Sequence, residues 1–160
     1  MNQNQNNELF KFKVLEIEEH TKYFDQLVNL FNDTFSSEPW CDSWNIEDLK
    51  QYIKECLEYK NGLNFIVLDG DKVIAMCFGR LVHWFTGMQY RADELCVSNS
   101  YQGKGIGNNF LNSILEYLKK SSIKSMVFDT ERPFPCYKFY LKHGFKENMT
   151  NANMIKIFDE

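Results

Sequence analysis

Three glycines, Gly103, Gly105 and Gly107, stand within five positions between two segments of different hydrophobic periodicity. The alternating residues 90–97 before them are typical of a β-strand. Apolar residues at helical spacing follow them: Phe110, Leu111, Ile114, Leu115 and Leu118. Glycine adopts positive φ and lets the backbone approach a ligand, and a helix N-terminus carries partial positive charge. The segment therefore predicts a strand, an anion-binding bend and a helix.

The spacing of the glycines excludes two common phosphate-binding loops. A P-loop requires a Lys-Ser or Lys-Thr pair after a longer interval between glycines, and here Gly107 is followed by Asn108. A dinucleotide fingerprint requires a small third residue, for which Asn108 is a poor substitute. The pattern Gln-x-x-Gly-x-Gly, over residues 102–107, fits without adjustment.

This pattern, Gln102-x-x-Gly105-x-Gly107, resembles the acyl-CoA-binding motif of the GNAT superfamily of N-acetyltransferases. A second segment, Tyr140-x-x-x-Gly144-Phe145, resembles another motif of that family and follows at the usual interval. The resemblance is specific over residues 89–146 and weaker over residues 8–88. It departs from the family at Pro133, where an Asn often contacts the cofactor, so no cofactor contact is assigned there.

Composition favours a single globular domain of a soluble, intracellular protein. The chain has 160 residues, 44% of them hydrophobic, so we expect a polar tail over residues 1–7 and one domain over residues 8–160. A net charge of −4 argues against nucleic acid as a partner. The sequence shows neither a signal-peptide pattern nor an apolar run of ~18 residues, so we expect no membrane contact. Five cysteines without metal-ligand spacing suit a reducing compartment and predict no metal site.

The periodicities predict an α/β (α+β) fold with helices on both faces of a mixed, mainly antiparallel sheet, in the order β-α-α-β-β-β-α-β-α-β-β. A first strand runs through Phe12, Val14 and Ile17 and ends near Glu18. Helices are predicted at 20–35, 46–60 and 133–142 and after the bend, and further strands at 64–68, 73–80, 89–97, 125–129, 145–147 and 154–158. Only the unit around the glycines requires a parallel pair of strands.

The family resemblance implies acetyl-CoA as the acyl donor and assigns residues to bind it. These residues are Leu95, Cys96, Val97, Gln102, Gly103, Lys104, Gly105, Ile106, Gly107, Asn108 and Tyr140. In the family the strand separates from its neighbour here, so the main chain near Val97 binds pantetheine and the Val97 N–H is the candidate oxyanion donor. The phenol of Tyr140 is expected to protonate the departing thiolate.

Acetyl transfer to an amine also requires a base. Presenting a lysine-like amine of pKa ~10.4 as the neutral form at pH 7 costs roughly 4–5 kcal/mol. Asp93 and Glu94 both stand at the strand position where several members carry a carboxylate, and strand alternation puts them on opposite faces. Glu94 shares its predicted face with Tyr90, Ala92 and Cys96. Asp93 would point with Leu95 and Val97, so Glu94 is preferred, with a solvated surface carboxylate as the alternative.

The segment between the first two helices gathers Trp40, Trp44, Glu38 and Asp42. Ring faces and carboxylates attract cations, so these four residues are candidates for binding a cationic acceptor. The alternative is a loop held by its tryptophans, with an acidic and solvated rim. Cys96 or Cys136 is not favoured as a covalent nucleophile, because neither has a histidine nearby in the sequence.

These features predict an acetyl-CoA-dependent N-acetyltransferase that moves an acetyl group to a primary amine of a small cationic molecule. The amine attacks directly in a ternary complex. Two alternatives remain open: a protein N-terminal or lysine acetyltransferase, and a non-catalytic acyl-CoA-binding module. A homodimer is compatible with the resemblance, although no residue specifies an interface.

Overall fold

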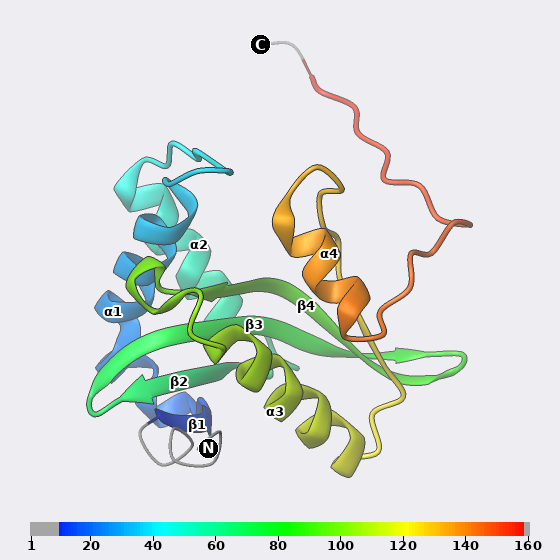
Figure 1. Ribbon diagram of the computed structural model, residues 1–160, viewed down its shortest axis with the longest axis horizontal. Coiled ribbons are helices and arrows are strands. Elements are labelled where there is room, and N and C mark those ends of the chain that lie inside the picture. Colours follow the sequence, from blue (N-terminus) through cyan, green and yellow to red (C-terminus); the bar gives the residue numbers. More distant parts are fainter. Residues whose placement is uncertain (1–9, 159–160) are drawn as a thin grey trace. The chain divides into compact units, whose positions relative to one another are not determined.

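The structure is a computed structural model that describes residues 10–158, arranged in two compact units (Figure 1). The first unit covers residues 10–128 and the second covers residues 129–158. The predicted polar tail, residues 1–7, lies outside the described residues, and the single domain over residues 8–160 stays a prediction. Within residues 10–158, no helix combines the length and apolar character needed to cross a membrane.

The first unit is a five-stranded mixed sheet with helices. Its elements are β1 (Phe10–Val14), the 3-10 helix η1 (Ile17–Glu19), α1 (His20–Phe35), α2 (Ile46–Glu58), β2 (Phe65–Asp69), β3 (Lys72–Trp84), β4 (Gly87–Val97), the 3-10 helix η2 (Asn99–Tyr101), α3 (Ile106–Lys120) and β5 (Ser125–Val127). The strands lie in the order β1-β2-β3-β4-β5, and all neighbours are antiparallel except β4 and β5. The mainly antiparallel sheet and its parallel pair at the glycine unit are confirmed.

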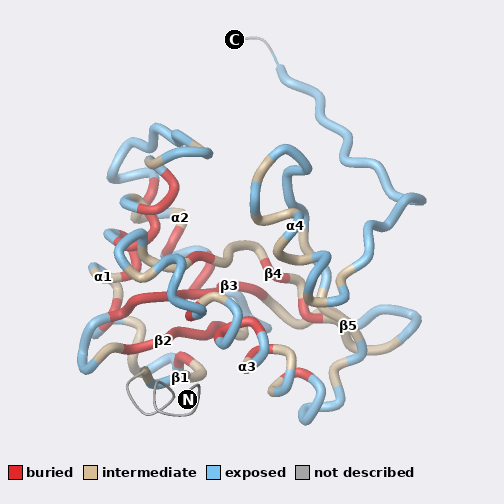
Figure 2. The backbone as a smooth tube through the Cα atoms, viewed as in Figure 1, coloured by how far each residue is buried: buried red, intermediate tan, exposed pale blue. Residues whose placement is uncertain are grey.

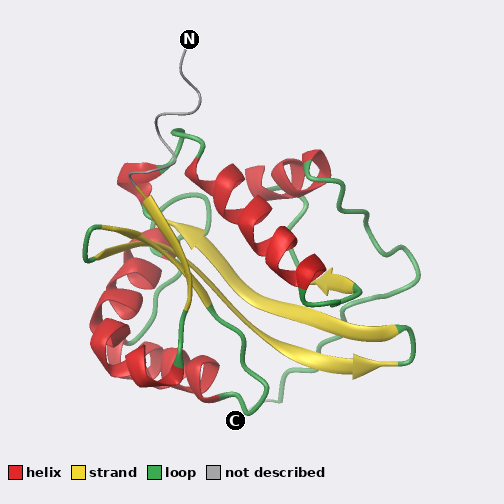
Figure 3. Ribbon diagram, turned by 90° about the horizontal axis from the view of Figure 1, so that it is seen from below, coloured by secondary structure: helices red, strands yellow, loops and turns green. Residues whose placement is uncertain are grey.

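Helices cover both faces of this sheet (Figure 3). The helices α1 and α2 pack on one face, around a core that includes Leu27, Phe31, Ile53 and Phe78. The helix α3 packs on the other face with Phe110 and residues of β2, β3 and β4. Buried residues therefore follow β2 and β3 along the middle of the sheet (Figure 2). Each helix presents one apolar stripe, as its sequence period requires.

Local sequence signals set the ends of the first two helices. The helix α1 covers residues 20–35, as predicted. The side chain of Asn45 accepts hydrogen bonds from the N–H groups of Glu47 at 2.9 Å and Asp48 at 3.4 Å, which confirms it as the N-cap of α2. These signals act within a few residues of each other, so they can be identified before the fold is known.

A β-bulge in β4 changes which residues share a face. Phe78 of β3 pairs with Glu94 and Gly79 pairs with Ala92, so Asp93 has no partner on β3. The predicted common face of Glu94, Tyr90, Ala92 and Cys96 is therefore wrong. Tyr90 and Ala92 pack on the α3 side, whereas Cys96 packs on the side of α1 and α2. Because of the extra residue, the side chains of Ala92 and Glu94 lie on opposite faces of the sheet, although they are two positions apart.

Gly79, at the register shift of β3, lets the backbone and the Tyr90 ring approach closely. A side chain at position 79 would meet the Tyr90 ring at 2.6 Å and the Arg91 carbonyl oxygen at 2.5 Å. The fully buried Tyr90 crosses this point, and its hydroxyl donates to the carbonyl of Leu63 at 2.9 Å. Only glycine allows this close approach.

The second unit contains α4 (Pro135–Lys142). Pro135 occupies the first turn, and Gly144 follows the helix at φ +81°, so the predicted end of the helix is confirmed. The Phe145 N–H donates to the carbonyl of Tyr140 at 3.2 Å.

Three stretches predicted as strand do not form one. Ile17 lies in η1 and is 79% exposed, because a capping box between Glu16 and Glu19 turns the chain after β1. Residues 145–147 and 154–158 are irregular, and the apolar side chains of the latter stretch are exposed. Alternating apolar residues form a strand only where a neighbouring strand supplies hydrogen bonds and a packed face, and an isolated hairpin is marginal in water.

Candidate active site

The glycine bend, residues 102–107, leads directly into α3. Gly103 and Gly105 adopt φ values of +73° and +79°, and Gly105 is the N-cap of the helix. The first helical hydrogen bond runs from the Asn109 N–H to the Gly105 carbonyl at 3.1 Å. Among the described residues, none accepts a hydrogen bond from the N–H groups of residues 103–107. These donors and the positive end of α3 form an arrangement that suits an anion.

The side chains of Gln102 and Lys104 hold the bend in place. The amide of Gln102 donates to the Val97 carbonyl at 3.0 Å and to the side-chain oxygen of Asn99 at 3.1 Å. The ammonium of Lys104 donates to the Ser100 carbonyl at 2.9 Å. The conspicuous Gln of the motif thus connects the bend to the end of β4.

The second half of β4 has an edge that β5 does not line. The two strands pair only over residues 89–91 and 125–127. On the opposite edge, the Ser98 N–H donates to the Ile74 carbonyl at 2.8 Å. Because main-chain groups alternate in direction along an antiparallel strand, Leu95 and Val97 direct their N–H and C=O groups away from β3. This edge leads to the glycine bend.

Glu94 lies on the face covered by α1 and α2. The Tyr52 hydroxyl of α2 donates to its Oε1 at 2.6 Å. Burial raises the pKa of Glu94 to about 7; the Tyr52 hydrogen bond opposes this shift, and the negative charges of Asp93 and Asp42 add to it. A carboxyl group with this pKa exchanges protons near neutral pH, as a general base must.

Asp93 is engaged elsewhere. Both of its carboxylate oxygens accept hydrogen bonds from Arg80, at 2.8 and 2.7 Å. The guanidinium of Arg80 also lies 4.7 Å from the centroid of the Tyr59 ring. The bulge thus directs Asp93 to a cationic partner, whereas the partner of Glu94 is a neutral phenol.

The predicted acceptor segment, residues 36–44, is held by its two tryptophans. Trp40 packs edge-on against Phe35 with ring centroids 5.2 Å apart. Trp44 is 39% exposed and stacks on Tyr52 at 5.3 Å. Glu38 and Asp42 are exposed. Asp42 is still close enough to contribute to the raised pKa of Glu94, so an acidic rim and the candidate base belong to one region.

The cysteines are poorly suited to nucleophilic catalysis. Cys96 is buried beneath α1 and α2, and burial raises the pKa of its thiol above the usual range. Cys136 lies in the second unit, where its sulfur contacts the Thr130 hydroxyl at 3.4 Å. In the part of the chain that the structure describes, no three His, Cys, Asp or Glu side chains come together as a metal site.

Tyr140 lies on α4 in the second unit. Its ring contacts those of Phe139 and Phe145, with centroids 5.3 and 5.8 Å away. In the same unit, Tyr137 donates to Glu147 at 3.0 Å. The expected role of Tyr140 toward a leaving thiolate stays a prediction.

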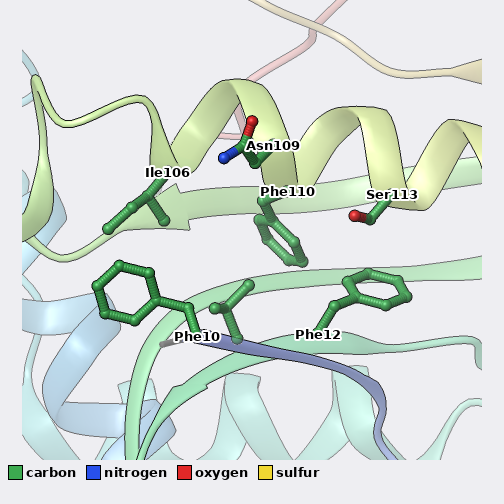
Figure 4. A pocket seen from close by; sticks show the side chains of 7 residues that line it. Phe10, Phe12, Ile106, Asn109, Phe110 and Ser113 are labelled. Carbon is green, nitrogen blue, oxygen red and sulfur yellow. The ribbon is translucent and has the colours of Figure 1, made fainter. Parts of the chain in front are cut away.

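A cavity of about 330 Å³ lies beside the first turns of α3 (Figure 4). It is lined by five apolar residues and two polar ones: Phe10, Phe12, Val67, Ile106 and Phe110, with Asn109 and Ser113. Of the predicted site residues, only Ile106 lines it. The cavity is therefore separate from the region of Glu94.

Comparison with known proteins decides the family. The sequence pattern of the acetyltransferase (GNAT) family matches residues 24–145. The chain belongs to the GNAT acetyltransferase family. It is therefore an acyltransferase of a family that uses acetyl-CoA as its donor. A search of curated proteins returned no match.

Solved structures share the GNAT fold. A possible acetyltransferase from Clostridium difficile 630 is 17% identical with a TM-score of 0.78, covering 94% of this chain and 99% of that chain. An aminoglycoside acetyltransferase from an uncultured soil metagenomic sample, in complex with sisomicin, is 15% identical with a TM-score of 0.67 and covers 98% of each chain. A ribosomal-protein-alanine N-acetyltransferase from Brucella melitensis is 11% identical with a TM-score of 0.67, covering 92% and 99%.

Sequence reasoning missed two residues of this candidate site. Tyr52 contacts Glu94 across 42 positions, and no local pattern marks it. Asn99, which accepts from Gln102, also donates to the Asp33 carbonyl at 3.0 Å and so ties the glycine bend to α1. Both contacts depend on the packing of helices against the sheet.

Proposed function

We propose that this protein is an acetyl-CoA-dependent N-acetyltransferase that acetylates a primary amine of a small cationic molecule by direct attack in a ternary complex. The observation that carries the proposal is the half-buried Glu94, with a pKa of about 7, in the strand that ends at the glycine bend. Base and donor site then belong to one continuous segment.

The residues near the bend fit acetyl-CoA. Five N–H groups over residues 103–107 and the start of α3 would bind its pyrophosphate. The outward main chain of Leu95 and Val97 would bind the pantetheine amides. Lys104 and Asn108 would line the same path, whereas Cys96 is buried beneath α1 and α2 and would contribute only by its place in the strand. When bound, acetyl-CoA supplies the thioester carbonyl and the thiolate leaving group.

The protein's own groups then have distinct tasks. Glu94 accepts the proton of the incoming ammonium, because its pKa is near the working pH. The Val97 N–H, directed away from β3, stabilises negative charge on the carbonyl oxygen. Tyr140 protonates the leaving sulfur. Of these three, Glu94 and Val97 lie in β4 and Tyr140 lies in α4.

Charge favours a cationic acceptor. Glu38 and Asp42 are exposed on the segment that carries Trp40 and Trp44, and Asp42 acts electrostatically on Glu94. A cation entering this region would gain from the carboxylates and from any contact with the ring face of the partly exposed Trp44. The aminoglycoside acetyltransferase among the similar structures was solved in complex with sisomicin, but at 15% identity it supports the fold alone.

A panel assay tests the proposal. The protein is incubated with acetyl-CoA and polyamines, aminoglycosides, amino acids or short peptides, and both free thiol and product mass are measured. We expect acetylated small cationic amines. Acetylation of peptides only would indicate a protein acetyltransferase. Binding of CoA without any product would indicate a non-catalytic module.

A further inference from the structure

We propose that Tyr52 is a positioning residue whose hydroxyl holds the Glu94 carboxylate in one orientation and in its charged form. The inference rests on the proposed function, in which Glu94 is the base. Tyr52 belongs to α2 and Glu94 to β4, and neither the sequence motifs nor the comparisons assign a role to Tyr52.

The contact itself is short and isolated from cations. The Tyr52 oxygen lies 2.6 Å from Oε1 of Glu94, in the range of a charge-assisted hydrogen bond. Among residues 10–158, no lysine, arginine or histidine forms an ion pair with Glu94, and the carboxylate that Arg80 binds is that of Asp93. The phenol is thus the group that compensates for the partial burial of this carboxylate.

The ring of Tyr52 is held on two sides. Trp44 stacks on it at 5.3 Å with an interplanar angle of 22°, and Phe31 of α1 packs edge-on at 5.9 Å. Aromatic contacts of this geometry restrict the ring to one orientation. The hydroxyl is therefore held at Glu94. Trp44, at the end of the acceptor segment, contacts the candidate base indirectly, through the ring of Tyr52.

Among the charged and titratable groups around Glu94, Tyr52 is the one that lowers the pKa of this carboxyl. These groups are Asp42 in the acceptor segment, Tyr52 and Cys56 in α2, Cys77 in β3, and Asp93 and Cys96 in β4. Burial, Asp93 and Asp42 raise the pKa of Glu94, and Tyr52 lowers it. Burial raises the pKa of all three thiols, so they are neutral at pH 7. Without the Tyr52 hydroxyl, the remaining effects on Glu94 are burial and the charges of Asp93 and Asp42, which all favour its protonated form.

The decisive variant is Tyr52→Phe, which keeps the ring and its packing and removes the hydroxyl. We expect the acid limb of the kcat/KM profile to move to higher pH by about one unit, from the typical strength of a hydrogen bond to a charged group. At pH values below the acid limb of the parent, kcat/KM of the variant would be about tenfold lower than that of the parent. At pH values well above the shifted limb, the two would be equal. The KM for acetyl-CoA would not change. Tyr59→Phe, at the end of the same helix, is the matched control and should leave the profile unchanged.

A uniform loss of activity at every pH would show a packing role and overturn the proposal, as would an unchanged profile. In a Glu94→Gln background, Tyr52→Phe should have little further effect; an additive loss would also overturn it. A ¹³C NMR titration of the Glu94 carboxyl, without substrates, separates this inference from the proposed function. A titration moved to higher pH by Tyr52→Phe supports the contact even if no amine is acetylated, and an unmoved one refutes it.

Discussion

Two regions of the candidate site are built in different ways. One is the glycine bend that follows β4, and the other is the Glu94 cluster, formed by Glu94, Tyr52 and Trp44. The bend offers main-chain N–H groups from five consecutive residues, 103–107. The Glu94 cluster instead brings together side chains from β4, α2 and the acceptor segment.

This difference predicts different sensitivities. A site made of main-chain groups depends on backbone conformation, so any side chain that disturbs φ should impair it. A site made of side chains depends on chemical identity and on the pKa of its central carboxyl. Substitutions in the two regions should therefore separate donor binding from the chemical step.

The largest effect is expected from Glu94→Gln. Loss of the base should lower kcat by roughly 100-fold or more, with an unchanged KM for acetyl-CoA. Steady-state kinetics at pH 8 measures both. If this variant keeps full activity, Glu94 is not the base, and the proposed division between the two regions fails.

The same variant should change how stability depends on pH. Burial raises the pKa of Glu94 from 4.5 to about 7, so the folded state binds more protons than the unfolded state between these values. The contribution of Glu94 to stability is therefore complete below about pH 4.5 and is lost as the pH rises through 7. Relative to the parent, Glu94→Gln should gain roughly 2–3 kcal/mol between pH 4 and pH 8. Urea unfolding at both pH values measures this difference, and a constant difference would contradict the raised pKa.

On the other side of the comparison, Gly105→Val should weaken donor binding. Gly105 has φ +79°, which a β-branched residue adopts only with strain of about 1–3 kcal/mol. We expect the KM for acetyl-CoA to rise about tenfold or more. Gly70→Val is the matched control, since Gly70 also has positive φ and no neighbour within 4 Å of its would-be side chain. It should lose stability but keep the KM; an equal rise in KM would assign the effect to general destabilisation.

A smaller effect on the same region is expected from Gln102→Ala. It removes the hydrogen bonds from the Gln102 amide to Val97 and Asn99. Each such bond contributes about 0.5–1.5 kcal/mol net, so the KM for acetyl-CoA should rise roughly three- to fivefold. Gln51→Ala removes a comparable side-chain bond on α2 and should have no effect on the KM. Isothermal titration with CoA gives the same comparison without turnover.

The smallest effect on activity is expected from Asp93→Asn. This variant weakens the pair with Arg80 and should cost about 1 kcal/mol of stability, while kcat stays within about threefold. Because the charge of Asp93 raises the pKa of Glu94, the acid limb should move to lower pH. A loss of activity as large as that of Glu94→Gln would instead identify Asp93 as the base.

Local signals in the sequence predicted several elements closely. The apolar period placed α1 at residues 20–35, Asn45 marked the start of α2, and Gly144 marked the end of α4. The errors lie where a strand needs a distant neighbour, at Ile17 and in residues 145–147 and 154–158. Hydrophobic periodicity can be read from one segment, but a β-strand forms only when a second segment pairs with it.

The bulge at Asp93 shows the same limit within the site. Strict alternation would put Glu94 on the face of Tyr90, but the bulge moves it to the side of α2. A bulge is defined by register against another strand, so a single segment does not reveal it.

The sequence by itself determined the glycine bend, because positive φ at Gly103 and Gly105 and the helix that follows are local requirements written in adjacent residues. Only the tertiary structure decided that Tyr52 meets Glu94 and that Arg80 takes Asp93. Those contacts arise from packing α2 on the sheet and from the register of β3 against β4, which no stretch of consecutive residues encodes.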